Sequence, residues 1–140
     1  MPRDMPFLIL VSIVVLVIIF LSYSKYVVKT DLEVRILNQT SACYSGQTPA
    51  SLAGWKNGNV VVSTSFETPD PCYRISSIKA VQQGDRIEVD IKTASGGVCV
   101  QCFGFKRSDY ELISPKIEKS MDIYVHAEDT TEQHVEVVLE

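Results

Sequence analysis

The hydrophobic pattern divides the chain into a short apolar segment and a longer segment in which apolar and polar residues alternate. Residues 7–23 read FLILVSIVVLVIIFLSY, where Ser12 and Ser22 are the only non-aromatic polar residues. A helix of about 17 residues is about 25 Å long, close to the thickness of a hydrocarbon core. No polar stripe recurs every third or fourth residue, as it does in a helix that packs on a soluble core. The pattern therefore predicts a transmembrane helix over residues 7–28, acting as a signal anchor, after a flank of residues 1–6.

A cleaved secretory signal peptide is the alternative interpretation of this segment. Ser22-Tyr23-Ser24 fits the small-x-small pattern of a cleavage site. The apolar run is longer than the core of most signal peptides, and Arg3 is the only basic residue ahead of it. Both features favour an anchor that is retained in the mature protein.

Charges next to the apolar segment and the chemistry beyond it favour opposite orientations. Lys25 and Lys29 follow the segment, and the positive-inside rule would keep them in the cytoplasm. Four Cys in a chain of this size suit an oxidising compartment, and Asn38-Gln39-Thr40 is an N-glycosylation sequon. Because a long folded domain is translocated largely regardless of nearby charge, we expect the domain to lie outside the cytoplasm, with Asn38 glycosylated.

Beyond residue 30 the pattern changes to a period of two, which is typical of strands with one buried face. No segment there has a convincing helical period, and the best candidate, residues 49–55, is too short to be more than a turn. We therefore expect an all-β domain over residues 30–140, an immunoglobulin-like β-sandwich of about seven or eight antiparallel strands. The expected strands cover residues 32–36, 59–66, 73–82, 86–92, 98–105, 110–113, 121–127 and 134–139.

Three local features refine this expectation. Gln83-Gly84-Asp85 predicts a hairpin turn, and the apolar phase slips at Ser76-Ser77, which indicates a bulge. If the last two strands form a hairpin, their apolar residues match when Ile123 pairs with Val137 and Val125 with Val135, which leaves residues 128–132 as the loop.

The same register places two histidines opposite each other on the solvent face. His126 then faces His134, and Tyr124 faces Glu136. Two cross-strand histidines beside a carboxylate could hold a metal weakly. We favour the simpler interpretation of two exposed histidines on an ordinary hairpin, and we expect no metal site and no cofactor.

The four cysteines, at positions 43, 72, 99 and 102, allow three disulfide connectivities. Cys99-Val100-Gln101-Cys102 has the spacing of a thioredoxin-like motif, but that motif works at a helix N-terminus. Here the motif lies in an expected strand, where residues three apart point to opposite faces. We therefore expect structural disulfides that link each of these two cysteines elsewhere. Thiol-redox chemistry and a zinc site made by all four cysteines are the alternatives.

A short cysteine pattern carries a resemblance to a known group of proteins. Thr68-Pro69-Asp70-Pro71-Cys72-Tyr73 is followed some 25 residues later by Gly96-Gly97-Val98-Cys99. This pattern resembles one in small, mostly uncharacterised exported β-domains of prokaryotes that follow a signal or lipid anchor, over about 45 of the 140 residues. The resemblance implies that Cys72 pairs with Cys99, which leaves Cys43 to pair with Cys102. It implies no activity.

Composition and motifs exclude several classes of function. The net charge is −4, from 13 basic and 17 acidic residues, which argues against nucleic-acid binding. No GxSxG, GxGxxG, P-loop or HExxH motif is present, and we expect no enzymatic activity. Trp55 lies in the turn-rich stretch SLAGWKNGN, where it either caps one end of the core or acts as an exposed anchor for a partner. Phe103 and Phe105 share this ambiguity.

The sequence thus predicts a single-pass, membrane-anchored, extracytoplasmic β-sandwich that serves as a binding or structural module. Such a module could be an accessory subunit of a cell-surface assembly, or an adhesion or inhibitor-like domain. Its expected partners are the membrane and another extracytoplasmic protein or a second copy of itself. The alternative function is a thiol-redox or metal-handling domain that uses Cys99 and Cys102.

Overall fold

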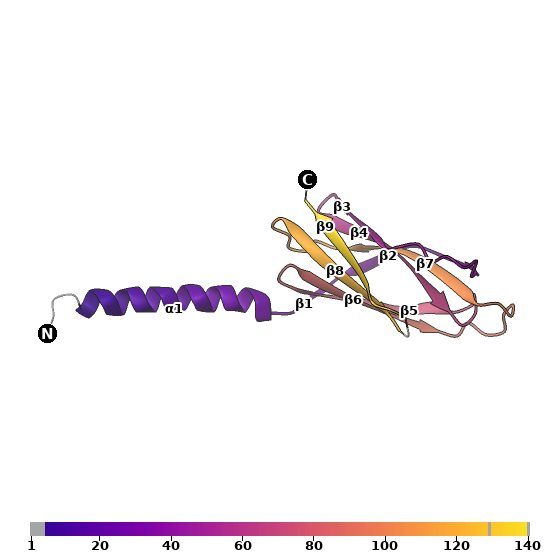
Figure 1. Ribbon diagram of the computed structural model, residues 1–140, viewed down its shortest axis with the longest axis horizontal. Helices are drawn as coiled ribbons and strands as arrows, with labels where there is room; N and C mark the ends of the chain where they lie inside the picture. Colours follow the sequence, from indigo (N-terminus) through magenta and orange to yellow (C-terminus); the bar gives the residue numbers. More distant parts are fainter. Residues whose placement is uncertain (1–4, 129, 140) are drawn as a thin grey trace.

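The computed structural model describes residues 5–128 and 130–139, apart from the side chains of residues 25–27. One helix, α1 (Met5–Val27), leads into a domain built from β-strands (Figure 1). Residues 1–4 of the predicted flank lie outside the described part of the chain.

Helix α1 begins two residues before the predicted segment 7–28 and ends one residue before its end. Its first 20 residues form a segment that is long and apolar enough to cross a membrane, and almost all the side chains of this segment are exposed. The hydroxyl groups of Ser12 and Ser24 donate to the carbonyl oxygens of Ile9 and Leu21, at 2.8 and 2.9 Å. These polar groups are therefore satisfied within the helix, as a hydrocarbon environment requires.

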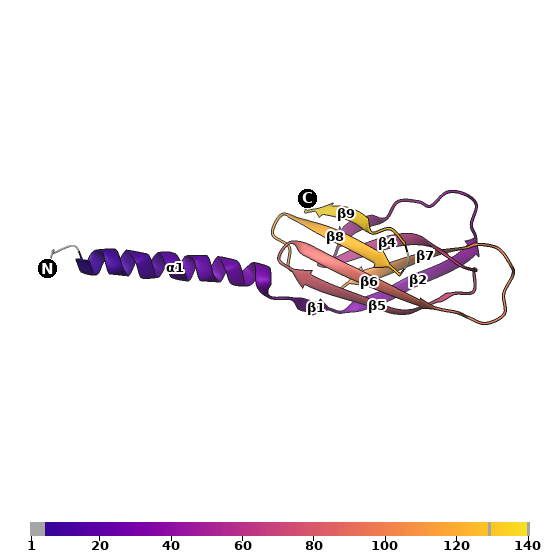
Figure 2. The same ribbon diagram turned by 60° about the horizontal axis from the view of Figure 1, so that its bottom comes forward.

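The strands form two sheets. Hydrogen bonds order them β1-β5-β6-β8-β9 in one sheet and β2-β7-β4-β3 in the other. Strands β6 and β8 are parallel, so the prediction that all strands pair antiparallel is wrong there. Parallel neighbours need a crossover, which β7 in the other sheet provides (Figure 2). The strands are β1 (Thr30–Leu32), β2 (Val34–Cys43), β3 (Leu52–Lys56), β4 (Asn59–Thr68), β5 (Arg74–Gln83), β6 (Arg86–Ala94), β7 (Gly104–Leu112), β8 (Ser120–Ala127) and β9 (Gln133–Val138).

Inward-facing side chains of the two sheets form one hydrophobic core. The alternation in β6 and β8 places every second residue on the buried face, which is the physical basis of the predicted strands. The strand order does not reproduce the ABED and CFG sheets of an immunoglobulin constant domain. The core residues are Val60, Val62, Phe66, Ala80, Ile87, Val89, Ile91, Tyr110, Leu112, Met121, Ile123, Val125, Ala127 and Val137.

Two predicted local features are confirmed. Strands β5 and β6 pair up to Gln83 and Arg86, so Gly84-Asp85 forms the tight turn of a hairpin. The register of this pair shifts between Ile75 and Ser77, which is the predicted bulge. Both features follow from local residue choices, glycine in the turn and a phase slip in the strand.

One expected strand is mostly wrong, another is part of a longer strand, and one expected turn is wrong. Residues 98–103 form a loop, and the separately predicted strand 110–113 is the end of the continuous strand β7. Trp55 lies in β3, which pairs with β4 around the tight turn Asn57-Gly58. Both turn residues have positive φ, 51° and 81°, which Asn and Gly tolerate best and which suits a two-residue hairpin.

The register predicted for the last hairpin is wrong by two residues. Ile123 pairs with Val135, and Tyr124 pairs with His134. A shift of two residues leaves every side chain on its own face, so the apolar pattern is compatible with either register. Residue 129, in the loop predicted between these strands, lies outside the described residues.

The β-domain has two distinct ends along its strands. The end next to α1, the proximal end, holds β1 and the β5–β6 turn, because Thr30 pairs with Gln82. Strand β6 runs away from that end, so the loop between Ala94 and Gly104 lies at the opposite, distal end (Figure 2). The elements that close the distal end therefore lie as far from the helix as the domain allows.

Candidate functional site

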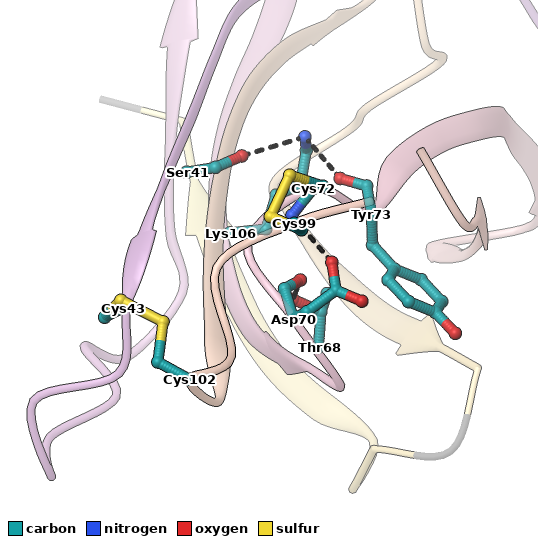
Figure 3. Close-up of a disulfide and its surroundings, with 9 residues drawn as sticks. All are labelled: Ser41, Cys43, Thr68, Asp70, Cys72, Tyr73, Cys99, Cys102 and Lys106. Carbon is teal, nitrogen blue, oxygen red and sulfur yellow. Dashed lines mark hydrogen bonds between the residues drawn. A yellow bond between two sulfur atoms is a disulfide. The ribbon is translucent and has the colours of Figure 1, made fainter. Parts of the chain in front are cut away.

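Two disulfides, drawn in close-up in Figure 3, attach the loop at the distal end of the domain. Cys43, the last residue of β2, is bonded to Cys102, and Cys72 is bonded to Cys99, with Cα–Cα distances of 5.7 and 5.8 Å. The Cys72–Cys99 bond is the pair that the resemblance implied, and Cys43–Cys102 is the pair that it left. Cys99 and Cys102 both belong to residues 95–103, called here the distal loop. The loop is thus attached covalently to β2 on one side and to the segment before β5 on the other.

Glycines allow the backbone of the distal loop to lie directly against the segment that precedes β5. A Cβ atom at Gly96 would collide with the carbonyl oxygen of Cys72, and one at Gly104 with Thr68 and the backbone of Asp70. The segment itself is ordered by Asp70, whose Oδ1 accepts the Cys72 N–H at 2.8 Å. Such an Asx turn holds the chain without regular secondary structure.

Lys106 is buried beneath the disulfides. It occupies an inward position of β7, where the side chain is 5% exposed, and its Nζ donates to Ser41 Oγ at 3.1 Å and to the Tyr73 carbonyl oxygen at 3.0 Å (Figure 3). Burial, with a smaller effect from the nearby charge of Arg74, lowers the pKa of Lys106. Its bonds join the strand that ends in Cys43 to the residue that follows Cys72. Lys106 therefore positions the two disulfide-bearing segments and is not available to a substrate.

The distal loop presents apolar side chains to solvent. Val98 is fully exposed, and Val100 and Phe103 are 69% and 77% exposed. No charged residue occurs from Thr93 to Phe105. The loop is held at its ends by both disulfides and by the Tyr44 N–H, which donates to the Phe103 carbonyl oxygen at 2.7 Å. A contiguous, exposed apolar surface on a braced loop is typical of an interaction site.

Carboxylates line the depressions at the distal end. The distal loop borders an open depression of about 590 Å³, which Asp70 also lines. Two neighbouring depressions, of about 450 and 380 Å³, are lined by Glu67, Glu128 and Glu132. Among the described residues, no Lys, Arg or His lines any of the three. These four carboxylates are called the acidic rim.

One carboxylate of the rim is held in its charged form. Glu128 accepts the Thr93 hydroxyl at 2.6 Å and the Thr93 backbone N–H at 3.1 Å. These two hydrogen bonds, with a smaller contribution from the charge of Lys92, lower the pKa of Glu128. This carboxylate of the acidic rim is therefore anchored to the end of β6.

The candidate residues for glycosylation and partner contact lie away from the distal loop. Asn38 is exposed on β2, next to the register shift between Ile36 and Asn38. Trp55 is 39% exposed on β3 at the proximal end, paired with Val60. Sequence reasoning located the four cysteines but missed the acidic rim and Lys106. The alternation in residues 104–112 would have placed Lys106 inside, had this segment been recognised as one strand.

The predicted pair of facing histidines does not form. His126 pairs with Asp90 and His134 with Tyr124. The His134 ring stacks on Tyr124 with 4.7 Å between ring centroids, and its Nε2 lies 2.8 Å from Asp122 Oδ1. The histidines therefore belong to separate surface pairs on the outer face of the sheet, and the register that would place them opposite each other is wrong.

The cysteines offer no free thiol as a nucleophile or metal ligand in this state. All four sulfur atoms are in disulfides, so Cys99 and Cys102 have no thiol. Ligand atoms of Asp70, Cys72 and Cys99 lie within 4.8 Å of one another, but the two sulfurs are bonded to each other. Thiolate ligation of a metal there would first require reduction of the disulfide.

Comparisons of this chain with protein-family models, curated proteins and solved structures found no match. A functional assignment therefore depends on the arrangement of the chain itself. That arrangement has two parts with different chemistry: an exposed apolar helix at one end, and a braced apolar loop with a carboxylate rim at the other.

Proposed function

We propose that this protein is a single-pass, membrane-anchored, extracytoplasmic binding module, an accessory subunit of a cell-surface assembly or an adhesion or inhibitor-like domain. Helix α1 would be the anchor, and the two-sheet domain a β-sandwich, immunoglobulin-like in its layers but with its own strand order. The observation that carries the proposal is the placement of the apolar helix and the disulfide-braced loop at opposite ends (Figure 1). A tether at one end leaves the other end free to reach a partner.

Two features support the extracytoplasmic location, and a third supports insertion of α1 in a membrane. Disulfides form and persist in oxidising compartments, and all four cysteines are bonded. The sequon at Asn38 lies on an exposed strand, where a glycan has room. The exposed apolar side chains of α1 have no described counterpart in the β-domain that would bury them, which favours insertion in lipid.

A binding role is favoured over catalysis and over nucleic-acid recognition. Among the described residues, the two buried ionisable groups are Lys106 and Tyr110, and both hydrogen-bond to other parts of the fold. The net charge of −4 disfavours nucleic acid. The partner would be the membrane together with another extracytoplasmic protein or a second copy.

The alternative, a thiol-redox or metal-handling domain, is favoured by one observation. Reduction of the Cys72–Cys99 bond would leave two thiols and the carboxylate of Asp70 close together. That function requires a reducing environment, so the orientation of the chain separates the two proposals.

A topology experiment on the full chain tests the proposed function. A protease added to intact cells should remove an epitope tag placed after residue 140, and a membrane-impermeant maleimide should label no thiol before reduction. Protection of the tag until the membrane is opened, together with two or more reactive thiols, would contradict the proposal and favour the redox alternative. Asn38→Gln controls for a glycan that shifts migration on the gel.

A further inference from the structure

The chemistry of the distal end restricts what it can bind. Val98, Val100 and Phe103 form the apolar tip of the distal loop. Burial of this tip in an apolar recess of a partner would lower the free energy of binding. The acidic rim beside the tip would be attracted to a partner whose surface around the recess is positively charged. The two features lie on adjoining surfaces, because Phe103 lines both the depression bordered by the loop and the one that contains Glu67 and Glu128.

We propose that the distal loop is the partner-binding surface, and that the partner is an extracytoplasmic protein with an apolar recess bordered by Lys and Arg. This inference rests on the proposed function, since it assigns the binding site of the proposed module. The bracing by two disulfides supports it, because a loop already fixed in its bound conformation loses little conformational entropy on binding.

The same charges disfavour the two other occupants of an apolar tip. Basic side chains are what attract a protein to lipid headgroups, and the depressions at this end are lined by carboxylates and, in the described residues, by no basic group. A second copy docked tip to tip would bring two acidic rims together, and like charges across an interface are unfavourable.

Site-specific photo-crosslinking of the full chain in its native membrane tests the proposal. A photoreactive residue is placed at Val98, and at Val138 as a matched control, since Val138 is also exposed but lies at the proximal end. A third site, Trp55, tests the partner contact predicted from the sequence. We expect one discrete adduct with a different protein from position 98, at a yield at least tenfold above that from position 138.

Charge removal tests the basic border of the recess. Glu67→Gln combined with Glu132→Gln should lower the yield of the adduct several-fold, and raising the salt concentration should do the same. Glu33→Gln combined with Glu136→Gln removes the same charge from exposed positions outside the rim, and should leave the yield unchanged. If Glu67→Gln with Glu132→Gln left the yield of the adduct unchanged, the proposed basic border would be contradicted.

The remaining outcomes each count against the proposal. A lipid adduct, an adduct with a second copy, equal yields at positions 98 and 138, or no adduct at position 98 would overturn it. A discrete adduct from position 55 with none from position 98 would retain the proposed binding module and move its site to β3. A cytoplasmic tag in the topology experiment would contradict the proposed function, whereas the crosslinking outcomes concern only the position and partner of the binding site. The two failures are therefore distinguishable.

Discussion

The two halves of the four-stranded sheet present different chemistry to the interior. Near the helix, the inward pairs of β4 and β7 are Val60 with Leu112 and Val62 with Tyr110, all fully buried. Toward the distal end, the inward positions change to Thr64 opposite Ser108 and Phe66 opposite Lys106. The Ser108 hydroxyl is buried and has no hydrogen-bond partner among the described residues. Along the same two strands, apolar pairs thus give way to pairs that contain a polar or charged side chain.

This contrast indicates that different forces stabilise the two ends. Burial of apolar side chains stabilises the proximal half by roughly 1.5–3 kcal/mol for each large residue. The distal half lacks that contribution at Lys106 and Ser108, and it is where both disulfides lie. A disulfide stabilises chiefly by restricting the unfolded chain, and so it can replace a missing core locally. The disulfides therefore stabilise the end of the domain that has a polar interior and an exposed loop.

The largest expected effect comes from removal of the disulfides. The Cys43–Cys102 bond closes a separation of 59 residues and the Cys72–Cys99 bond one of 27. We expect Cys43→Ser with Cys102→Ser to lower the free energy of unfolding by about 4 kcal/mol, and Cys72→Ser with Cys99→Ser by about 3.5 kcal/mol. Urea unfolding of the full chain in detergent micelles measures both. Decreases in the free energy of unfolding below about 1 kcal/mol would show that packing, and not the disulfides, stabilises the distal end.

A smaller effect is expected from the proximal core. Val137 is 3% exposed and its neighbour Val138 is 60% exposed, so the two residues form a matched pair. Val137→Ala should cost about 2 kcal/mol, because two buried methyl groups are lost and a cavity remains. Val138→Ala should change the free energy of unfolding by less than about 0.5 kcal/mol. Equal losses in the same urea experiment would show that β9 does not cover the core as described.

The buried ammonium of Lys106 should give the distal end a characteristic pH dependence. Because its pKa in the folded state lies below the ordinary value of 10.5, folded Lys106 loses its proton before unfolded Lys106 does as the pH rises. The stability of the wild type relative to Lys106→Met should therefore increase between neutral pH and pH 10.5 and then level off. Lys79→Met, which removes an exposed charge, corrects for the change in net charge. A difference that does not vary with pH would contradict the buried charge.

The smallest expected effect concerns the exposed contact between Glu128 and Thr93. The pKa of Glu128 is lowered from its ordinary value of 4.5, so the contact stabilises the fold above that pH and is lost as the pH falls through the lowered pKa. Glu128→Gln should be less stable than the wild type at pH 7, and the two should become equal in strong acid. Thermal unfolding at both pH values checks this, and an unchanged difference in acid would refute it.

Local patterns were sufficient to predict the parts of the fold that depend on neighbouring residues. The alternation in β6 and β8 predicted their buried faces, and Gly84-Asp85 predicted the hairpin between β5 and β6. Alternation identifies a face but not a neighbour, so the parallel pairing of β6 with β8 could not be anticipated. For the same reason the register of β8 and β9 was misjudged by two residues.

The distal end was the least predictable region for a physical reason. Val98, Val100 and Phe103 have high strand propensity, yet the disulfides on either side of Val100 hold this segment as a loop. The acidic rim consists of residues far apart in the chain, such as Glu67 and Glu132. No regular spacing in the sequence predicts that they lie close together. Trp55 was misplaced because the hairpin signal Asn57-Gly58 beside it was overlooked.

Hydrogen exchange of the full chain before and after disulfide reduction tests the central comparison most directly. Reduction should increase exchange in the distal loop, residues 95–103, and at the end of β2 beside Cys43. Residues 121–125 of β8, in the apolar core, should keep their protection. Unchanged exchange at the distal loop, or loss of protection at both ends together, would contradict the view that covalent bonds hold one end and apolar burial the other.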